Sequence, residues 1–488
     1  MQRRNFLKSI GKGLCAAGTL SLFSGCSFST KPNILLIVTD DHGYADMGCT
    51  GLADDVKTPN MDRLAQKGVR FTQAYATSPI CSPSRMSIIT GVYNQRFGTY
   101  WYGGKGIHKE QFSTIPEILK QEGYNTGYVG KVHYGSHKYD SDPGNRNFPM
   151  QHGFDYFYGF TSPRKHYLKH NAAAERHFQK VKKEHNKWGQ SLRQGPMWIN
   201  DKQQDQSGFS THLFGDKCRE FIDRIQDQPF FLQLSFNAVH NFTHQLPKEY
   251  LEKHDLKGYH DWNPAKEDYY QWYKEGRKPN NPEGRAHYLG QLYYLDKEIG
   301  KVIDHLEEKN LRKDTLIIMI SDNGGSTPIY ANNSPFRGSK YTLYEGGIRV
   351  PMIISWPGSF RQRAVSKNMA SGLDILPTIC NAGGAEIPEN IDGLDLTPIL
   401  KRSQTDYGHG ELVWDTGTQT AVRKGKWKLR TATSKKSQDY EMVELELGEF
   451  LYNLEEDPGE TTNLKDQYPE VFDQLKKIYK NWKKDIKN

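Results

Sequence analysis

Four runs of consecutive apolar residues, many of them β-branched, divide the chain, and each has the length of a single strand. They span 33–39, 229–236, 315–320 and 350–355. Apolar runs without polar alternation are typical of strands that are buried on both faces of a parallel sheet. Helical patterns lie between them, for example at 288–308. Strands that alternate with helices predict an α/β fold, with a mixed, mostly parallel sheet flanked by helices.

The pattern changes after about residue 405. The last part carries a hairpin with a turn glycine, one short strand and a basic amphipathic helix, at 421–429, 450–454 and 468–486. These short elements are typical of an antiparallel sheet covered by one helix. We therefore expect a main domain over 31–404 and a smaller C-terminal α+β subdomain over 405–488.

The N-terminus has the pattern of an export signal. Arg3 and Arg4 form a twin-arginine pair, a short apolar stretch follows at 14–23, and 22–26 resembles a lipobox that ends in Cys26. Such a segment is processed and does not belong to the fold. We expect residues 1–25 to be removed and the protein to be exported to the periplasm or cell surface. Its contact with a membrane would then be through a lipid on Cys26, or absent if the signal is cleaved without lipidation.

Charge and cysteine content argue against nucleic-acid binding and against a disulfide-stabilised scaffold. The 488 residues carry a formal net charge of +8, which falls to +4 when the four basic residues of 1–25 are lost. That value gives no support to nucleic-acid binding. Of the six cysteines, Cys49, Cys218 and Cys380 are left after the two N-terminal ones and Cys81 are set aside. Their odd number and irregular spacing predict no disulfide scaffold.

Polar side chains follow two of the predicted strands. Asp40 and Asp41 come directly after the first run, and Asp322 and Asn323 come just after the third. In open α/β sheets ligands bind beyond the carboxyl ends of the strands, so both pairs are expected at one site. Acidic residues often end strands for capping reasons alone. Together, however, these oxygen donors suit calcium or magnesium better than zinc.

Cys81 lies in a Ser/Pro-rich segment and begins the motif Cys-x-Pro-x-Arg, which ends at Arg85. A cysteine there could be a buried thiol, a zinc ligand or a nucleophile. Zinc is disfavoured because no second Cys or His lies beside it at ligand spacing. The next residues, including Ile88 and Ile89, indicate the start of a helix. Cys81 would then lie near a helix N-terminus, where backbone N–H groups favour an anion.

Three further segments carry basic side chains. Lys131 and His133 are two residues apart, and in an extended segment they would point to the same side. His240 follows the second strand, and Lys340 lies in a Gly- and Ser-containing loop at 334–340, where it could meet an anion as a point charge. Taken singly, these residues are explained as well by a surface loop or a structural histidine.

In this order along the chain, the motifs resemble those of the type I, formylglycine-dependent sulfatases of the alkaline-phosphatase-like superfamily. The resemblance runs from about residue 31 to the segment 457–464. It implies an alkaline-phosphatase-like fold and sulfate ester hydrolysis. The chain departs from the family at Val132 and Tyr134, where Trp and Leu are usual, which concerns the shape of the pocket more than its chemistry.

The resemblance also implies a nucleophile and a metal. Cys81 would be oxidised to formylglycine by a formylglycine-generating enzyme, and the hydrate of that aldehyde would be the nucleophile. Asp40, Asp41, Asp322 and Asn323 would bind one Ca²⁺ ion, which would also contact residue 81.

The basic residues receive roles from the same resemblance. Arg85 and Lys131 would stabilise the hydrate and its alkoxide. His133 would take a proton when the sulfated intermediate collapses. His240 and Lys340 would hold the sulfate and assist departure of the alcohol.

The expected substrate is a sulfated carbohydrate. The stretch 164–193 holds nine Lys or Arg against two acidic residues, which suits a polyanionic chain as well as it suits a solvated charged surface. A cluster of aromatic residues could stack on sugars, although a packed helical face is the more common explanation; it comprises Trp262, Tyr269, Tyr270, Trp272 and Tyr273.

We expect a sulfatase acting on a marine algal polysaccharide such as ulvan or carrageenan, ahead of host glycosaminoglycans. A phosphodiester or phosphonate hydrolase of the same superfamily is one alternative. The other is a catalytically silent, surface glycan-binding lipoprotein, which would have lost a key residue; the sequence has lost none.

Overall fold

The computed structural model describes residues 31–161, 167–169, 197–204, 206–225, 228–260, 266–267, 269–402, 407–434 and 443–486. The expected signal at 1–25 lies outside these ranges, as does the basic stretch 164–193 apart from 167–169. The structure below is that of the compact unit Pro32–Asn488. Within the described ranges, no helix has both the length and the apolar character needed to cross a membrane.

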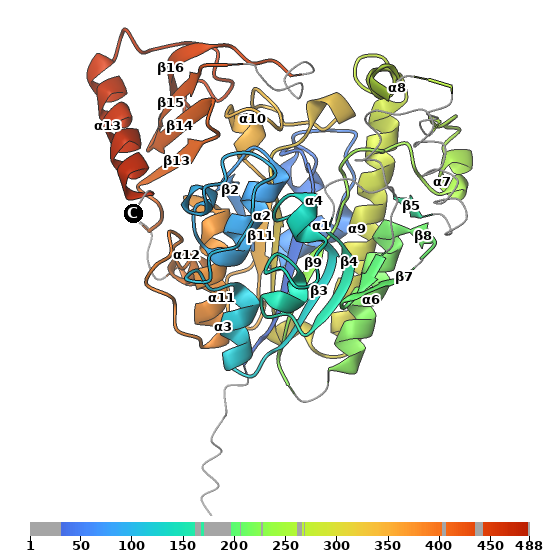
Figure 1. Ribbon diagram of the computed structural model, residues 1–488. Helices are drawn as coiled ribbons and strands as arrows, with labels where there is room; N and C mark the ends of the chain where they lie inside the picture. The colour runs from blue at the N-terminus through green and yellow to red at the C-terminus, as the bar shows by residue number, and fades with distance from the viewer. Residues whose placement is uncertain are drawn as a thin grey trace, which may run out of the picture. The chain divides into compact units, whose positions relative to one another are not determined.

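A ten-stranded sheet forms the centre of this unit (Figure 1), with strand order β12-β2-β11-β10-β1-β9-β3-β4-β6-β7. The strands are β1 Asn33–Thr39, β2 Val69–Tyr75, β3 Asn125–Lys131, β4 Tyr156–Phe160, β6 Met197–Ile199, β7 Lys202–Gln204, β9 Phe230–Ser235, β10 Thr315–Ser321, β11 Met352–Ser355 and β12 Ala364–Ser371. The predicted strands in the first three apolar runs are confirmed, and they pair in parallel as neighbours β10-β1-β9. The fourth run forms β11, which is antiparallel to both of its neighbours.

Register brings two strand ends together. β1 and β10 pair from Asn33 with Thr315 to Thr39 with Ser321, without a break. The acidic residues that follow Thr39 and Ser321 therefore leave the sheet at the same edge and side by side.

Helices cover both faces of the sheet. They are α1 Pro59–Gln66, α2 Cys81–Thr90, α3 Ile115–Gln121, α4 His137–Asp140, α6 Ser210–Arg224, α7 Lys248–Lys253, α8 Tyr269–Glu275, α9 Gly284–Glu308, α10 Glu345–Ile348, α11 Ile375–Gly383 and α12 Thr397–Lys401. Short 3₁₀ turns occur at Gly48–Thr50, Asn94–Phe97, Pro149–Gln151, Arg312–Asp314, Thr327–Ile329 and Gly372–Asp374. The predicted helix at 288–308 is confirmed within α9.

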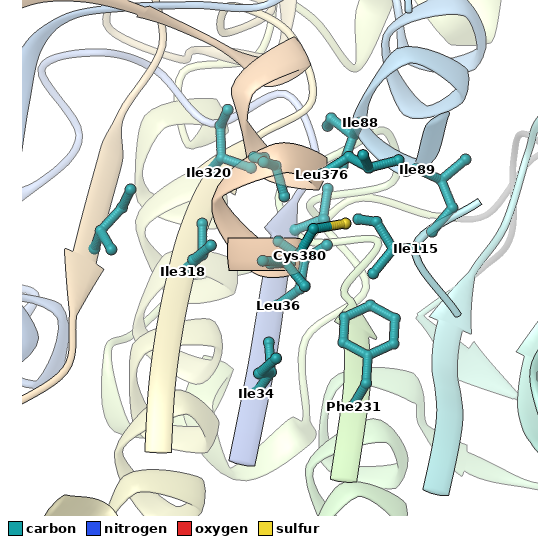
Figure 2. Close-up of a cluster of buried hydrophobic side chains, with 14 of the residues drawn as sticks. Ile34, Leu36, Ile88, Ile89, Ile115, Phe231, Ile318, Ile320, Leu376 and Cys380 are labelled. Carbon is teal, nitrogen blue, oxygen red and sulfur yellow. The ribbon is translucent and has the colours of Figure 1, made fainter. Parts of the chain in front are cut away.

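Alternation along the central strands divides the core into two layers, because successive side chains point to opposite faces. On one face, Ile34 and Leu36 of β1 pack against helices α2, α3 and α11. Figure 2 shows this layer, with Leu376 and Cys380 of α11 lying over β1. On the other face, the alternate residues of β1 pack against α1, α6 and α9. The first face thereby fixes α2, the helix that begins at Cys81.

The C-terminal part forms a second sheet, an antiparallel meander of β13 Glu411–Asp415, β14 Gln419–Lys424, β15 Trp427–Ala432 and β16 Gly448–Asn453. The predicted hairpin is the β14–β15 pair, and its turn glycine, Gly425, has φ 55°. Helix α13, Pro469–Asp485, packs against β14 and β15 through Leu475 and its apolar neighbours. Two further strands, β5 Leu168–Lys169 and β8 Gly208–Phe209, pair separately. The subdomain with its antiparallel sheet is confirmed, while its boundary at residue 405 stays a prediction.

A buried cluster of charges joins the second sheet to the first. Lys428 of β15 lies 2.9 Å from both Glu345 of α10 and Glu460, and all three side chains are buried. Arg349 and Arg423 also approach Glu345, at 3.2 and 3.5 Å. Burial would raise the pKa of Glu345, but Lys428, Arg423 and Arg349 outweigh that effect and lower the pKa to about 2. Ion pairs that are buried from water thus hold the C-terminal subdomain against the main sheet.

Replacing Lys428 by Met is expected to lower the free energy of unfolding by about 3–5 kcal/mol, because two buried carboxylates would lose their shared cation. Urea denaturation followed by circular dichroism measures this change. The matched control is Lys424→Met, since the Lys424 side chain is 43% exposed and lies 3.7 Å from Glu411. The control should cost at most about 1 kcal/mol. Equal losses in the two variants would contradict a structural role for the buried cluster.

Candidate active site

The acidic residues at the two strand ends form one connected group. The backbone N–H of Asp41 donates to Asp322 Oδ1 at 3.3 Å, and Asn323 Nδ2 donates to Asp41 Oδ1 at 2.8 Å. Asp41 has φ 54°, a left-handed conformation that turns the chain sharply after β1. Asp40, Asp41, Asp322 and Asn323 are all buried. The predicted convergence of these two pairs is confirmed as geometry.

Cys81 is the first residue of α2, as predicted from the sequence, and Ile80 before it is extended. The side chain is buried, and its Sγ lies 3.5 Å from Asp40 Oδ1 and 3.3 Å from Lys340 Nζ. Burial raises the pKa of the thiol, although Lys131 and Lys340 oppose that effect. Residue 81 therefore lies between one carboxylate and one ammonium group at a helix N-terminus.

Three buried cations face the three carboxylates. Lys131 Nζ contacts Asp40 Oδ2, Arg85 Nε lies 2.7 Å from Asp322 Oδ2, and Lys340 Nζ lies 2.7 Å from Asp41 Oδ1. Charges buried to this degree are stable only when they are paired. Burial lowers the pKa of Lys340, but Asp41 and the other acidic groups around it raise the pKa well above its ordinary value.

Arg85 is also tied to the end of β3. Its Nη1 donates to the carbonyl of Lys131 at 3.0 Å, and Tyr128 donates to the same carbonyl at 2.6 Å. Burial raises the pKa of Asp322, and Arg85 opposes this effect through the ion pair. Helix α2 and strand β3 thus fix each other's basic side chains at the site.

His240 reaches the same group from the loop after β9. Its Nε2 lies 3.7 Å from Asp41 Oδ2. Tyr167 holds this loop in place, since its hydroxyl donates to the carbonyls of Asn237 and His240 at 2.8 and 3.2 Å. Tyr167 is fully buried and was not predicted, because it lies at the edge of the basic stretch, where no periodic pattern indicates a role.

His133 is placed differently from the prediction. Strand β3 ends at Lys131, and His133 has φ 55°, so the segment is not extended and the expected alternation of side chains does not apply. That prediction is wrong, because the backbone turns immediately after Lys131. His133 is buried. We assign it to the site because it follows Lys131 by two residues.

The donor set fits a metal ion. Asp40, Asp41, Cys81 and His240 each offer one ligand atom, and these atoms lie within 4.8 Å of one another. Asn323 Oδ1 is buried and accepts no hydrogen bond from the described residues. Buried polar oxygens rarely lack a partner, and oxygen-rich sets with carboxylates and an amide carbonyl are typical of Ca²⁺ sites. His240 belongs to this group by distance, a proximity that the sequence did not predict.

Aromatic rings flank Lys340. Trp101 stacks at a tilt on Tyr341 and on Tyr102, with ring centroids 6.3 and 5.6 Å apart, and Lys340 Nζ lies 5.4 Å from the Tyr341 centroid. We call Trp101, Tyr102 and Tyr341 the aromatic rim. The predicted aromatic cluster is different: Trp272 is buried, while Trp262 and the side chains of Tyr269, Tyr270 and Tyr273 lie outside the described residues.

Comparison with known proteins places this site in a family. The sulfatase family model matches residues 32–385, and a model of the N-sulphoglucosamine sulphohydrolase C-terminal region matches 338–485. Human (Homo sapiens) arylsulfatase A is 29% identical, with 94% of this chain and 89% of the human protein aligned.

Solved structures agree. A crystal structure of Ps i-CgsB in complex with k-i-k-neocarrahexaose superposes with a TM-score of 0.75 at 27% identity, covering 93% of each chain. PsFucS1 sulfatase from Pseudoalteromonas sp. gives a TM-score of 0.71 at 26% identity, covering 94% of this chain and 91% of that one. The chain belongs to the sulfatase family, and it is a sulfuric ester hydrolase with the alkaline-phosphatase-like fold.

Proposed function

We propose that this enzyme removes sulfate groups from a sulfated algal polysaccharide or its oligosaccharides, with formylglycine at position 81 as the nucleophile. One observation carries the proposal. Residue 81 begins a buried helix and lies in contact with Asp40 on one side and Lys340 on the other. A nucleophile held there has an anion-binding helix terminus and a fixed cation beside it.

The charges of the site suit an anionic ester. Three buried carboxylates face three buried cations, so the protein groups alone balance. Asp40, Asp41, Asp322 and Asn323 would hold one Ca²⁺ ion, which supplies Lewis-acid stabilisation of the charge that develops on sulfate oxygens. The excess positive charge would then match a sulfate ester and an ionised oxygen on residue 81.

The basic residues divide the remaining work. Hydrated formylglycine supplies an attacking hydroxyl and a second hydroxyl through which sulfate can be expelled. Arg85 and Lys131 would donate hydrogen bonds to oxygen on residue 81, and Lys340 would hold a sulfate oxygen. His240 would give a proton to the leaving alcohol oxygen, and His133 would take a proton from residue 81.

Substrate class follows from the relatives and the aromatic rim. Ps i-CgsB, which is 27% identical, is complexed with a neocarrahexaose. The aromatic faces of Trp101, which is partly exposed, and Tyr102, which is exposed, present apolar surface with polar edges, which suits contact with sugar rings. These observations move carrageenan ahead of ulvan as the first polysaccharide to test.

We further propose export through the twin-arginine signal, lipid attachment at Cys26, and maturation by a formylglycine-generating enzyme. These steps would bring the enzyme to external glycans. They rest on the sequence of 1–26 and on the Cys-x-Pro-x-Arg motif.

Sulfate release measured by ion chromatography tests the function. The enzyme is produced together with a formylglycine-generating enzyme and incubated with carrageenan, ulvan and glycosaminoglycan oligosaccharides, with Ca²⁺ or with a chelator. We expect release from one algal glycan, and loss of that release in the chelator. Peptide mass spectrometry reports whether Cys81 is converted. Converted enzyme that releases no sulfate, but hydrolyses phosphodiesters or phosphonates, would overturn the proposal.

A further inference from the structure

A groove of about 960 Å³ runs between the C-terminal sheet and α13, separate from the site that holds Cys81. One wall is made by β14, β15 and the start of β16, and the other by the C-terminal half of α13. Figure 1 shows α13 lying along this sheet. The lining residues that matter below are Thr431, Thr433, Lys477, Lys480 and Lys484.

The helical wall of the groove is basic. Lys476, Lys477, Lys480, Lys483 and Lys484 all line it. At about 100° per residue they occupy one strip about 120° wide, directly beside the apolar strip that packs on the sheet. All five side chains are exposed, which leaves their ammonium groups accessible to a ligand.

Acidic residues neutralise this strip only in part. Glu449 lies 3.0 Å from Lys476, and Asp415 lies 3.4 Å from Lys483. Within the described residues, Lys477 and Lys480 have no ion-pair partner, and neither has Lys484. Three adjacent ammonium groups, spread over about two turns of helix, therefore face solvent along the groove.

The floor of the groove combines apolar surface with hydroxyl groups, as a binding site for a sugar chain requires. The partly exposed ring of Tyr479 provides apolar surface, and the hydroxyls of Thr420 and Thr431 lie there 2.6 Å apart. Thr433 adds a further hydroxyl at the rim, where it donates to the carbonyl of Thr418. A hollow lined in this way fits an extended chain with ring faces and hydroxyls better than it fits a flat anionic surface.

The groove and the site that holds Cys81 lie on opposite faces of the C-terminal sheet. Leu429 of β15 packs on the α13 side, whereas Ala432 packs in one cluster with Ile80 and Tyr341 on the other side. A chain held in the groove must therefore pass round this sheet to reach residue 81.

We propose that this groove is a second binding site for an anionic, sulfated polysaccharide chain, and that Lys477, Lys480 and Lys484 contact its sulfate groups. The identity of the chain as a sulfated one rests on the proposed function. The site would hold the polymer while units further along it are presented to residue 81.

The test separates binding from catalysis by using the full chain with Cys81→Ala, which binds without turnover. Affinity for ι-carrageenan is measured by calorimetry in the triple variant Lys477→Glu, Lys480→Glu, Lys484→Glu. The matched control is Lys67→Glu, Lys313→Glu, Lys401→Glu, which makes the same charge change at exposed positions, two of them just before β2 and β10. A second groove variant carries Arg at the three positions.

We expect the groove Glu variant to bind about tenfold more weakly, because three favourable charge contacts become unfavourable. The control and the Arg variant should bind as the parent does. The difference should shrink in about 1 M NaCl, where the Debye length falls to about 3 Å. If the Glu variant does not fold, a triple Gln variant takes its place, with a smaller loss expected.

Equal affinities of the groove and control variants would overturn the proposal. So would carrageenan binding that is unchanged while binding to phosphatidylglycerol vesicles is lost, since the strip would then be a membrane contact. In formylglycine-bearing enzyme, the groove variant should hydrolyse 4-nitrocatechol sulfate at the parent rate and show a raised KM for carrageenan alone. Groove-dependent binding without any aryl sulfate hydrolysis would contradict the proposed function and leave this inference standing.

Discussion

Cys81→Ala and Cys81→Ser are expected to lose sulfate ester hydrolysis by about 10⁴-fold or more, the scale on which removal of a nucleophile acts in other hydrolases. Alanine removes the reacting group. Serine gives a single hydroxyl, which could accept sulfate but has no second hydroxyl to expel it. Sulfate release by ion chromatography and turnover of 4-nitrocatechol sulfate measure the loss.

The same variants are expected to bind Ca²⁺ at the proposed metal site. Asn323 Nδ2 donates to Asp41 Oδ1, and this contact does not involve residue 81. Calorimetric titration of Ca²⁺ into Cys81→Ala should therefore give an affinity close to that of the parent. Cys218→Ser is the matched control, since Cys218 is also a buried free thiol but lies on α6. Full activity of Cys81→Ala would remove the formylglycine mechanism altogether.

His240→Asn should lose about 10²- to 10³-fold in kcat on a sulfated sugar and much less on 4-nitrocatechol sulfate. The reason is the leaving group. A sugar alkoxide is a strong base and needs a proton as it departs, whereas a nitrocatecholate leaves readily without one. The proposed donation would depend on the loop that carries His240, in which Tyr167 donates to two backbone carbonyls.

The loss of kcat on the sulfated sugar, divided by the loss on 4-nitrocatechol sulfate, distinguishes a catalytic role of His240 from a structural one. A merely structural role for His240 would lower both activities by the same factor. His305→Asn is the control, because His305 lies on α9 and pairs with Asp223. It should leave both rates unchanged.

Sequence alone was informative where one physical rule governed the structure. The apolar runs of β1, β9 and β10 could be predicted because strands buried on both faces need apolar residues throughout. β2 and β12 were missed, since each mixes buried positions with partly or fully exposed ones near one edge of the sheet. The direction of β11 could not be predicted either, because apolar content carries no information about strand polarity.

The residues of the active site were likewise predictable only where one physical rule placed them. The meeting of Asp40 with Asp322 was predictable, since both follow parallel strands that end at one edge. The positive φ of His133 was not, because a histidine gives no sign of a left-handed turn. Tyr167 was missed for another reason: it acts through backbone carbonyls that any sequence would supply.

The buried charge cluster of Lys428, Glu345 and Glu460 limits which members of this family could exchange their C-terminal subdomains. Glu345 lies five residues after Lys340, and one of its countercharges comes from β15 in the other sheet. A chimera that took its C-terminal subdomain from a relative without a lysine at this place would leave Glu345 with Arg349 but without the cation that it shares with Glu460. Recombination of these two parts would thus be restricted to donors that carry the matching charges, even when the backbones superpose well.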